Sequence, residues 1–95
     1  MKFIIAAAIG AVVNYTHAKL IEVDSAEQAQ RSAAKFAYQE FDGQSPNRGL
    51  SFDVFYVAEG VDVKVPGTAN EIASGRLKLS AVEMLRNNYG NEVQS

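Results

Sequence analysis

The stretch that decides the fold is VDSAEQAQRSAAKFAYQEFDGQSPNRGLSF, residues 23–52. In its first half, apolar residues recur at steps of three and four, which predicts one amphipathic helix of about four turns. The predicted apolar stripe consists of Ala26, Ala29, Ala33, Phe36, Ala37 and Phe41. Because most of these side chains are small, we expect a sheet to pack closely against this face of the helix.

Both ends of the predicted helix carry recognisable signals. Ser25 followed by Gln28, or Asp24 followed by Glu27, forms a capping box, in which each side chain accepts a hydrogen bond from a backbone N–H of the first turn. Residues 42–43, Asp-Gly, predict the end of the helix, because glycine readily adopts the left-handed conformation found there. Residues 45–49 are then a loop.

Beyond the loop, the hydrophobic period changes to two, which is typical of β-strands. Residues 50–57 and 61–65 are predicted strands, and they could form a hairpin that turns at residues 59–60. Residues 77–82 are a third predicted strand. The alternative for the end of this third segment is a helical turn, since residues 80–83 form another capping box, and residues 80–95 stay open between strand, helix and disorder.

The N-terminal segment has the pattern of an export signal. A short positive start precedes residues 3–13, which lack polar side chains, and small residues stand at Thr16 and Ala18. We therefore expect residues 1–18 to be a signal peptide that is cleaved after Ala18, leaving residues 19–95 as a single secreted, extracellular domain. The alternative is a retained hydrophobic helix over residues 1–18, and only this alternative implies a membrane partner.

Composition excludes several classes of function. The chain has 95 residues, 47% of them hydrophobic and 21% charged, with a formal net charge of -2, so it is one ordinary globular domain and is not expected to bind nucleic acid. It has no cysteine, and its single histidine, His17, lies within the predicted signal. We therefore expect no disulfide, no metal site, no cofactor and no catalytic residues, and predict that the protein is not an enzyme.

Residues 34–42, AKFAYQEFD, resemble the long helix of the cystatins, whose pattern is L/A-x-F-A-V-x-E-Y/H-N. Residues 50–52, LSF, are similar to the L-E-F that often opens the next strand in the plant branch of that family. The resemblance implies an α+β fold, with one long N-terminal helix packed on an antiparallel sheet after the signal peptide. It also implies a secreted inhibitor that occludes the active-site cleft of a papain-like cysteine protease.

The resemblance also implies which residues would bind the protease. In the family, a hairpin tip of the form Q-x-V-x-G and an N-terminal segment enter the protease cleft together. The best match to the tip is residues 71–75, and a second register places it at residues 56–60. The predicted protease-binding residues are Glu71, Ile72, Ala73, Ser74 and Gly75 from the tip, with Lys19, Leu20 and Ile21 from the N-terminal segment.

The chain departs from the family pattern at several points. Glu71 stands where the family has glutamine, no glycine follows Ala18, and the chain contains no tryptophan. The alternative function is therefore a non-inhibitory secreted or membrane-associated interaction or structural protein. Because the family's final strands have no counterpart here, the sheet would keep a pairing edge, and a homodimer formed by strand exchange is a further expectation.

Overall fold

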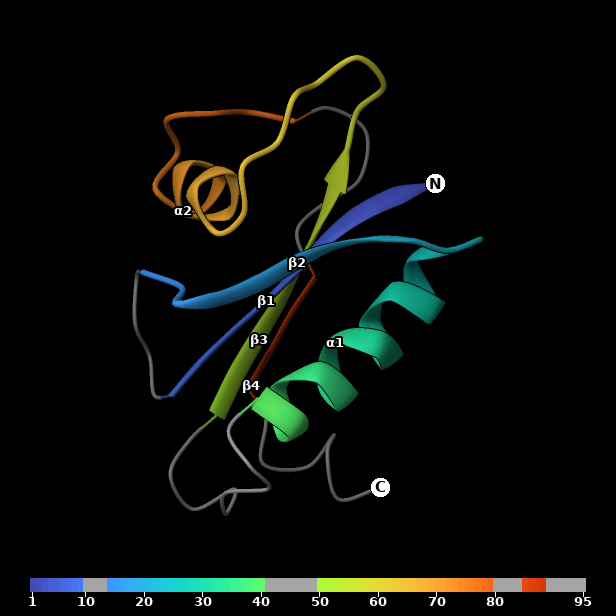
Figure 1. The fold of residues 1–95 in the computed structure, drawn as a ribbon, viewed down its shortest axis with the longest axis vertical. Helices are drawn as coiled ribbons and strands as arrows, with labels where there is room; N and C mark the ends of the chain where they lie inside the picture. The colour runs from blue at the N-terminus through green and yellow to red at the C-terminus, as the bar shows by residue number, and fades with distance from the viewer. Residues whose placement is uncertain (10–13, 41–49, 80–84, 89–95) are drawn as a thin grey trace.

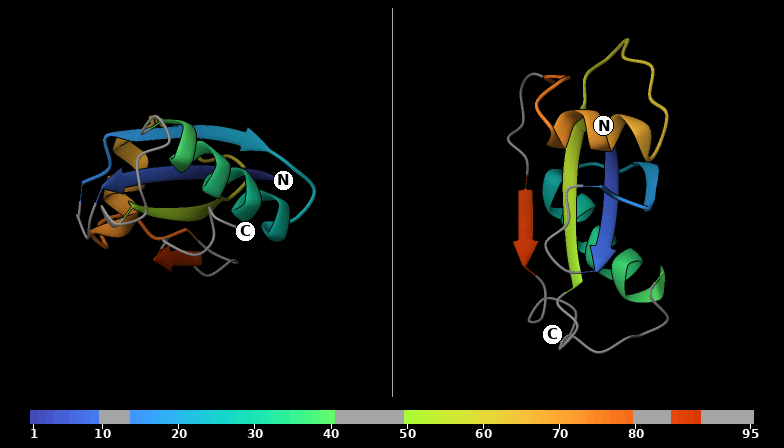
Figure 2. Two further views of the ribbon diagram at one scale, coloured as in Figure 1. Left: turned by 90° about the horizontal axis from the view of Figure 1, so that it is seen from below. Right: turned by 90° about the vertical axis from the view of Figure 1, so that its left-hand side faces the viewer.

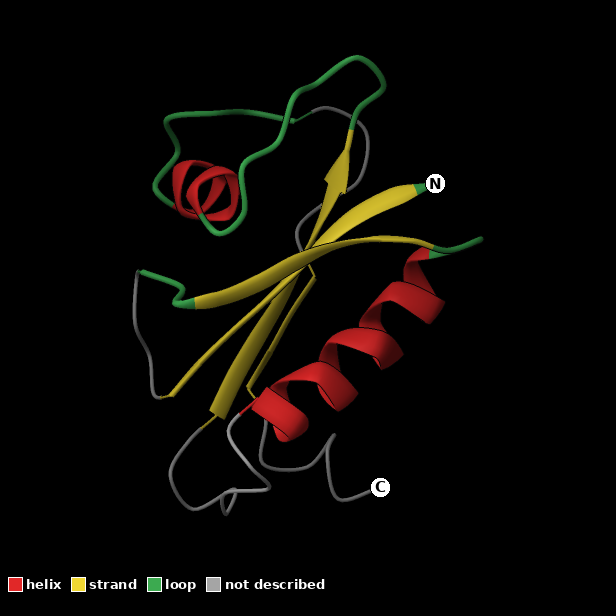
Figure 3. Ribbon diagram, in the orientation of Figure 1, coloured by secondary structure: helices red, strands yellow, loops and turns green. Residues whose placement is uncertain are grey.

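The computed structural model describes residues 1–9, 14–40, 50–79 and 85–88. Its strands are β1 (Lys2–Ile9), β2 (His17–Glu22), β3 (Leu50–Val57) and β4 (Leu85–Asn88). They form one antiparallel sheet in the order β2-β1-β3-β4. Helices α1 (Ala26–Glu40) and α2 (Gly67–Ala73) cover opposite faces of this sheet (Figures 1 and 3). The fold is therefore α+β, as the sequence predicts.

Strand β1 occupies the interior of the sheet. It pairs with β2 along one edge and with β3 along the other, from Lys2↔Glu22 and Lys2↔Val57 onward. Its side chains from Phe3 to Ala8 are at most 3% exposed. A strand that is buried on both faces needs apolar residues at consecutive positions, which explains the unbroken run that begins at Phe3.

The position of β1 bears on the predicted signal peptide. Residues 2–9 form a strand, so the alternative of a retained hydrophobic helix over residues 1–18 is wrong for this part of the chain. Among the residues that the structure describes, no helix has the length and apolar character needed to cross a membrane. Cleavage after Ala18 stays a prediction, but it would remove β1, and the sheet described here needs that strand.

Helix α1 confirms the predicted amphipathic pattern but not its place in the chain. Two strands precede it, so the expectation of an N-terminal helix is wrong. Half of the predicted capping box forms as expected, since the Ser25 Oγ accepts the backbone N–H of Gln28 at 3.2 Å. The Gln28 Oε1 accepts the backbone N–H of Asp24, one residue before Ser25, at 2.9 Å. The predicted helix end at residues 42–43 and Phe41 of the predicted stripe lie outside the described residues.

The sheet carries a hydrophobic core on each face. Small side chains of α1 let that helix approach β1 and β3, and Phe36 fills the remaining space. The buried residues on this face are Phe3, Ile5, Ala7, Ala29, Ala33, Phe36, Ala37, Phe52 and Val54. On the opposite face, below α2, they are Ile4, Ala6, Ala8, Tyr15, Phe55, Val57 and Ala69.

The predicted strands have different outcomes. The first matches β3. Residues 61–65 do not form a strand, although Val61, Val63 and Val65 alternate, because these three side chains pack against the core below α2 without a ladder partner. Residues 77–79 are not in a strand either, and residues 80–82 lie outside the described part. The next described strand is β4, which begins at Leu85 and pairs with β3 on the side away from β1.

The central position of β1 predicts the result of removing residues 1–18. A chain of residues 19–95 would expose both hydrophobic cores and separate β2 from β3, so we expect it to be unfolded. Far-UV circular dichroism during heating should show a cooperative transition for the full chain and none for the shortened one. A cooperative transition in the shortened chain would contradict this arrangement of the sheet.

Candidate functional site

The residues predicted to bind a protease lie on separate elements. Lys19, Leu20 and Ile21 are in β2 at one edge of the sheet. The remaining five were expected at the tip of a hairpin, and this expectation is wrong for their local structure. Glu71, Ile72 and Ala73 form the last turn of α2, Ser74 is its C-cap, and Gly75 follows. The structure therefore does not join these eight residues into one wedge.

Gly75 ends α2 through the hydrogen-bond pattern of a Schellman motif. Its backbone N–H donates to the carbonyl of Ile72 at 3.0 Å, and the N–H of Arg76 donates to the carbonyl of Glu71 at 2.9 Å. Gly75 has a φ of +81°, in the left-handed region that glycine adopts at little cost. The sequence signal for a turn at Gly75 was thus sound, but the turn closes a helix.

The second register for the tip, residues 56–60, also fails to form a hairpin. Tyr56 and Val57 end β3, and the turn that follows is closed by the N–H of Val61 donating to the carbonyl of Ala58 at 3.2 Å. Gly60 has a φ of +84° in this turn. Because residues 61–65 do not return along β3 as a strand, no protruding loop of paired strands results.

The open edge of β2 is the strongest candidate for a functional site. Among the described strands, β2 pairs only with β1, so its outer side faces no other strand. The backbone N–H of Val23 donates to the carbonyl of Met1 at 3.0 Å, which makes Met1 and Val23 a hydrogen-bonded pair. Antiparallel ladders alternate such pairs with pairs whose N–H and C=O groups point away.

This alternation fixes which backbone groups of β2 face outward. Two and four positions along the ladder from Met1 and Val23 lie the pairs Phe3↔Ile21 and Ile5↔Lys19, which are therefore hydrogen-bonded pairs as well. The backbone groups of Ile21 and Lys19 thus bond to β1. The outward-pointing N–H and C=O groups are those of Ala18, Leu20 and Glu22. A strand placed against this edge would bond to these three residues.

The side chains of β2 divide between the two faces of the sheet. Ile21 packs against the α1 core, and the Lys19 ammonium lies over the Phe36 ring, 5.2 Å from its centroid. Leu20 points to the opposite face, where it is 40% exposed. The middle of β2 therefore carries an exposed apolar side chain, Leu20, while the ammonium group of the neighbouring Lys19 lies on the α1 face of the sheet.

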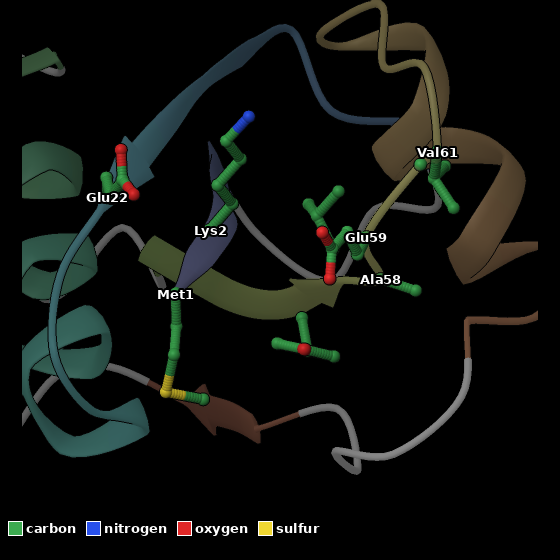
Figure 4. A pocket seen from close by; sticks show the side chains of 9 residues that line it. Met1, Lys2, Glu22, Ala58, Glu59 and Val61 are labelled. Atoms are coloured by element: carbon green, nitrogen blue, oxygen red, sulfur yellow. The ribbon is translucent and has the colours of Figure 1, made fainter.

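A second candidate is a pocket of about 340 Å³ at one end of the sheet. Figure 4 shows Lys2, Glu22 and Glu59 around it, contributed by β1, β2 and the turn after β3. These three charged side chains are exposed, and Met1, also in the lining, is 49% exposed. Sites for small molecules are usually enclosed and mostly apolar, so this pocket lacks their usual features.

A third candidate is the buried polar cluster between β3 and α2. Asp53 is 2% exposed and accepts a hydrogen bond from the phenol of Tyr15. The backbone N–H of Tyr15 donates to the Asn70 side-chain oxygen at 2.6 Å, and the Asn70 amide nitrogen donates to the Tyr15 carbonyl at 3.4 Å. These hydrogen bonds hold Tyr15, which lies two residues before β2, against α2 and β3, so the cluster has a structural role.

Comparisons with known proteins and metal-site geometry add no further assignment. No protein-family model, no curated protein and no solved structure matches this chain. Within residues 1–9, 14–40, 50–79 and 85–88, no three histidine, cysteine, aspartate or glutamate side chains are grouped so that they could hold a metal ion. The open edge of β2 is therefore a candidate site because of its geometry alone.

The left-handed conformation of Gly75 predicts the effect of adding a side chain there. Gly75→Ala should lower the free energy of unfolding by about 1 kcal/mol, because alanine is strained at positive φ even though nothing lies within 4 Å of the new Cβ. Gly67→Ala is the matched control: its Cβ would meet only the Lys64 Cβ at 3.9 Å, and stability should not fall. Urea denaturation measures both, and equal losses would contradict the Schellman geometry.

The buried cluster predicts a second difference in stability. Tyr15→Phe removes the phenol that donates to Asp53, and should lower the free energy of unfolding by about 1–3 kcal/mol. Tyr38→Phe is the control, since Tyr38 is 42% exposed on α1 and its hydroxyl should contribute less than about 0.5 kcal/mol. Urea denaturation of the two variants should separate them, and an unchanged Tyr15→Phe variant would refute this role of Tyr15.

Proposed function

We propose that this protein is a non-catalytic protein-binding module that adds a strand from a partner to the open edge of β2. The observation that carries the proposal is the combination of outward backbone groups at Ala18, Leu20 and Glu22 with the exposed Leu20 side chain. In strand addition, backbone hydrogen bonds supply affinity, and alternate side chains supply specificity. The partner segment would be extended, with an apolar side chain opposite Leu20.

The position of α1 supports this proposal. The helix packs mainly on β1 and β3 and more lightly on β2, and β2 lies at the border of the sheet formed by the described strands (Figure 2). Edge strands are often protected by lysine side chains that point past the edge. Here the Lys19 ammonium lies over the Phe36 ring instead, so the charge that could repel a partner strand is displaced onto the α1 face.

Inhibition of a papain-like protease stays a prediction that the resemblance to the cystatins implies. The five residues assigned to its hairpin tip lie in and after α2, so the open edge of β2 is the better supported binding surface.

A photo-crosslinking experiment tests the proposed function. The photoreactive residue p-benzoylphenylalanine would replace either Leu20 or Tyr38, which are similarly exposed, at 40% and 42%, on β2 and on the outer face of α1. Irradiation in the native host should give a discrete adduct from position 20 and none from position 38.

The adduct must also depend on the outward backbone groups. A semisynthetic chain that carries the probe at position 20 and an N-methylated Glu22 amide, added to a lysate of the native host, loses one outward donor while keeping the bonds to β1, so its adduct should be weaker than that of the unmethylated chain in the same lysate. N-methylation at Asp62, outside the sheet, is the control. Equal adducts from positions 20 and 38, or no adduct from position 20, would contradict strand addition at β2.

A further inference from the structure

We infer that the strand added to β2 is β2 of a second copy of this chain, paired antiparallel about a two-fold axis at Leu20. This inference rests on the proposed function of the same edge and names its partner. The described strands of the two copies would form one continuous sheet of eight, because each copy contributes four of them. No segment would have to leave its own fold, which distinguishes this dimer from strand exchange.

The alternation of inward and outward backbone groups along β2 restricts the registers in which two copies of this strand can pair. Within β2 (His17–Glu22), only Ala18, Leu20 and Glu22 present N–H and C=O groups outward. A hydrogen-bonded pair across the new interface must therefore join two of these residues. When two identical strands pair antiparallel, this condition requires the two-fold axis to pass through one residue position of β2. Three such positions, here called centres, keep most of both strands paired: Lys19, Leu20 and Ile21.

The side chains select one of these three centres. A centre at Lys19 places Lys19 directly opposite Lys19 of the second copy, and like charges in that position destabilise a sheet. A centre at Ile21 places each exposed Leu20 opposite a Glu22 carboxylate. A centre at Leu20 avoids both arrangements, because the two leucines then face each other.

The centre at Leu20 also satisfies the rest of the strand. Ala18 lies opposite Glu22 of the second copy, and Lys19 lies opposite Ile21. The three outward residues then form three hydrogen-bonded pairs, with about six backbone hydrogen bonds in total. The exposed apolar side chain at the middle of the edge becomes the centre of the interface, where burial contributes most to binding.

The two-fold pairing determines on which side of the joint sheet the helices lie. Directly opposite residues in a sheet point to the same face, so both copies of α1 would lie on one side and both copies of α2 on the other. In each copy α1 packs mainly on β1 and β3 and more lightly on β2. Figure 2 shows β2 at the border of the sheet formed by the described strands.

The absence of native cysteine allows the register to be tested directly. In single-cysteine variants of the full chain, Leu20→Cys should give a disulfide-linked dimer under air with a copper catalyst, because Cα atoms of a hydrogen-bonded pair are about 5.5 Å apart. Ala18→Cys and Glu22→Cys should each stay unlinked, since identical residues there are offset by four positions, or about 13 Å. A mixture of these two variants should give the mixed dimer.

Sedimentation equilibrium of the cysteine-free protein tests the association itself. The unmodified chain should dimerise reversibly, and Leu20→Lys should raise the dimer dissociation constant at least about tenfold by placing two lysines opposite each other. Tyr38→Lys, at a similarly exposed position on α1, should leave the constant unchanged. Circular dichroism would verify that each variant is folded.

The outcomes separate this inference from the proposed function. Linking of Leu20→Cys alone, together with the mixed dimer, supports the register. A monomeric chain at millimolar concentration, or equal linking at all three positions, overturns self-pairing. If the chain is monomeric but still crosslinks from position 20 to a different protein, self-pairing is wrong, whereas the proposed addition of a partner strand to β2 is still supported.

Discussion

The burial of β1 on both faces and along both edges is the constraint on which the rest of the structure depends. Its odd-numbered side chains from Phe3 to Ala7 meet α1, and its even-numbered ones from Ile4 to Ala8 meet the core below α2. Its two ladders hold β2 and β3 apart. Both cores and both neighbouring strands therefore depend on one short segment, and β2 lies at an edge because β1 takes the centre.

The elements with a clear period could be predicted from the sequence. The stripe of α1 and the box at Ser25 are local features, so their residues specify the helix without reference to distant parts of the chain. Strand β3 likewise follows from its alternation and β-branched and aromatic residues. The coarse α+β class follows from these two elements.

The remaining elements depend on contacts that a local pattern cannot specify. An unbroken apolar run such as residues 3–9 fits an export signal and a doubly buried strand equally well. Alternating valines at residues 61–65 serve packing against a core as readily as pairing in a ladder. Gly75 signals a left-handed turn, but not whether a hairpin or a helix precedes it. Lys19, Leu20 and Ile21 were predicted to bind a partner, but only the sheet order shows that they lie at an edge.

Native-state hydrogen exchange measured by NMR tests the central position of β1 most directly. Because both of its edges are paired, the amides from Phe3 to Ala8 should all be among the slowest to exchange in the protein. Within β2, the amides of Lys19 and Ile21 should be protected by their bonds to β1. Rapid exchange throughout residues 3–8 in the folded protein would contradict the account, because it would mean that this segment is not the interior strand.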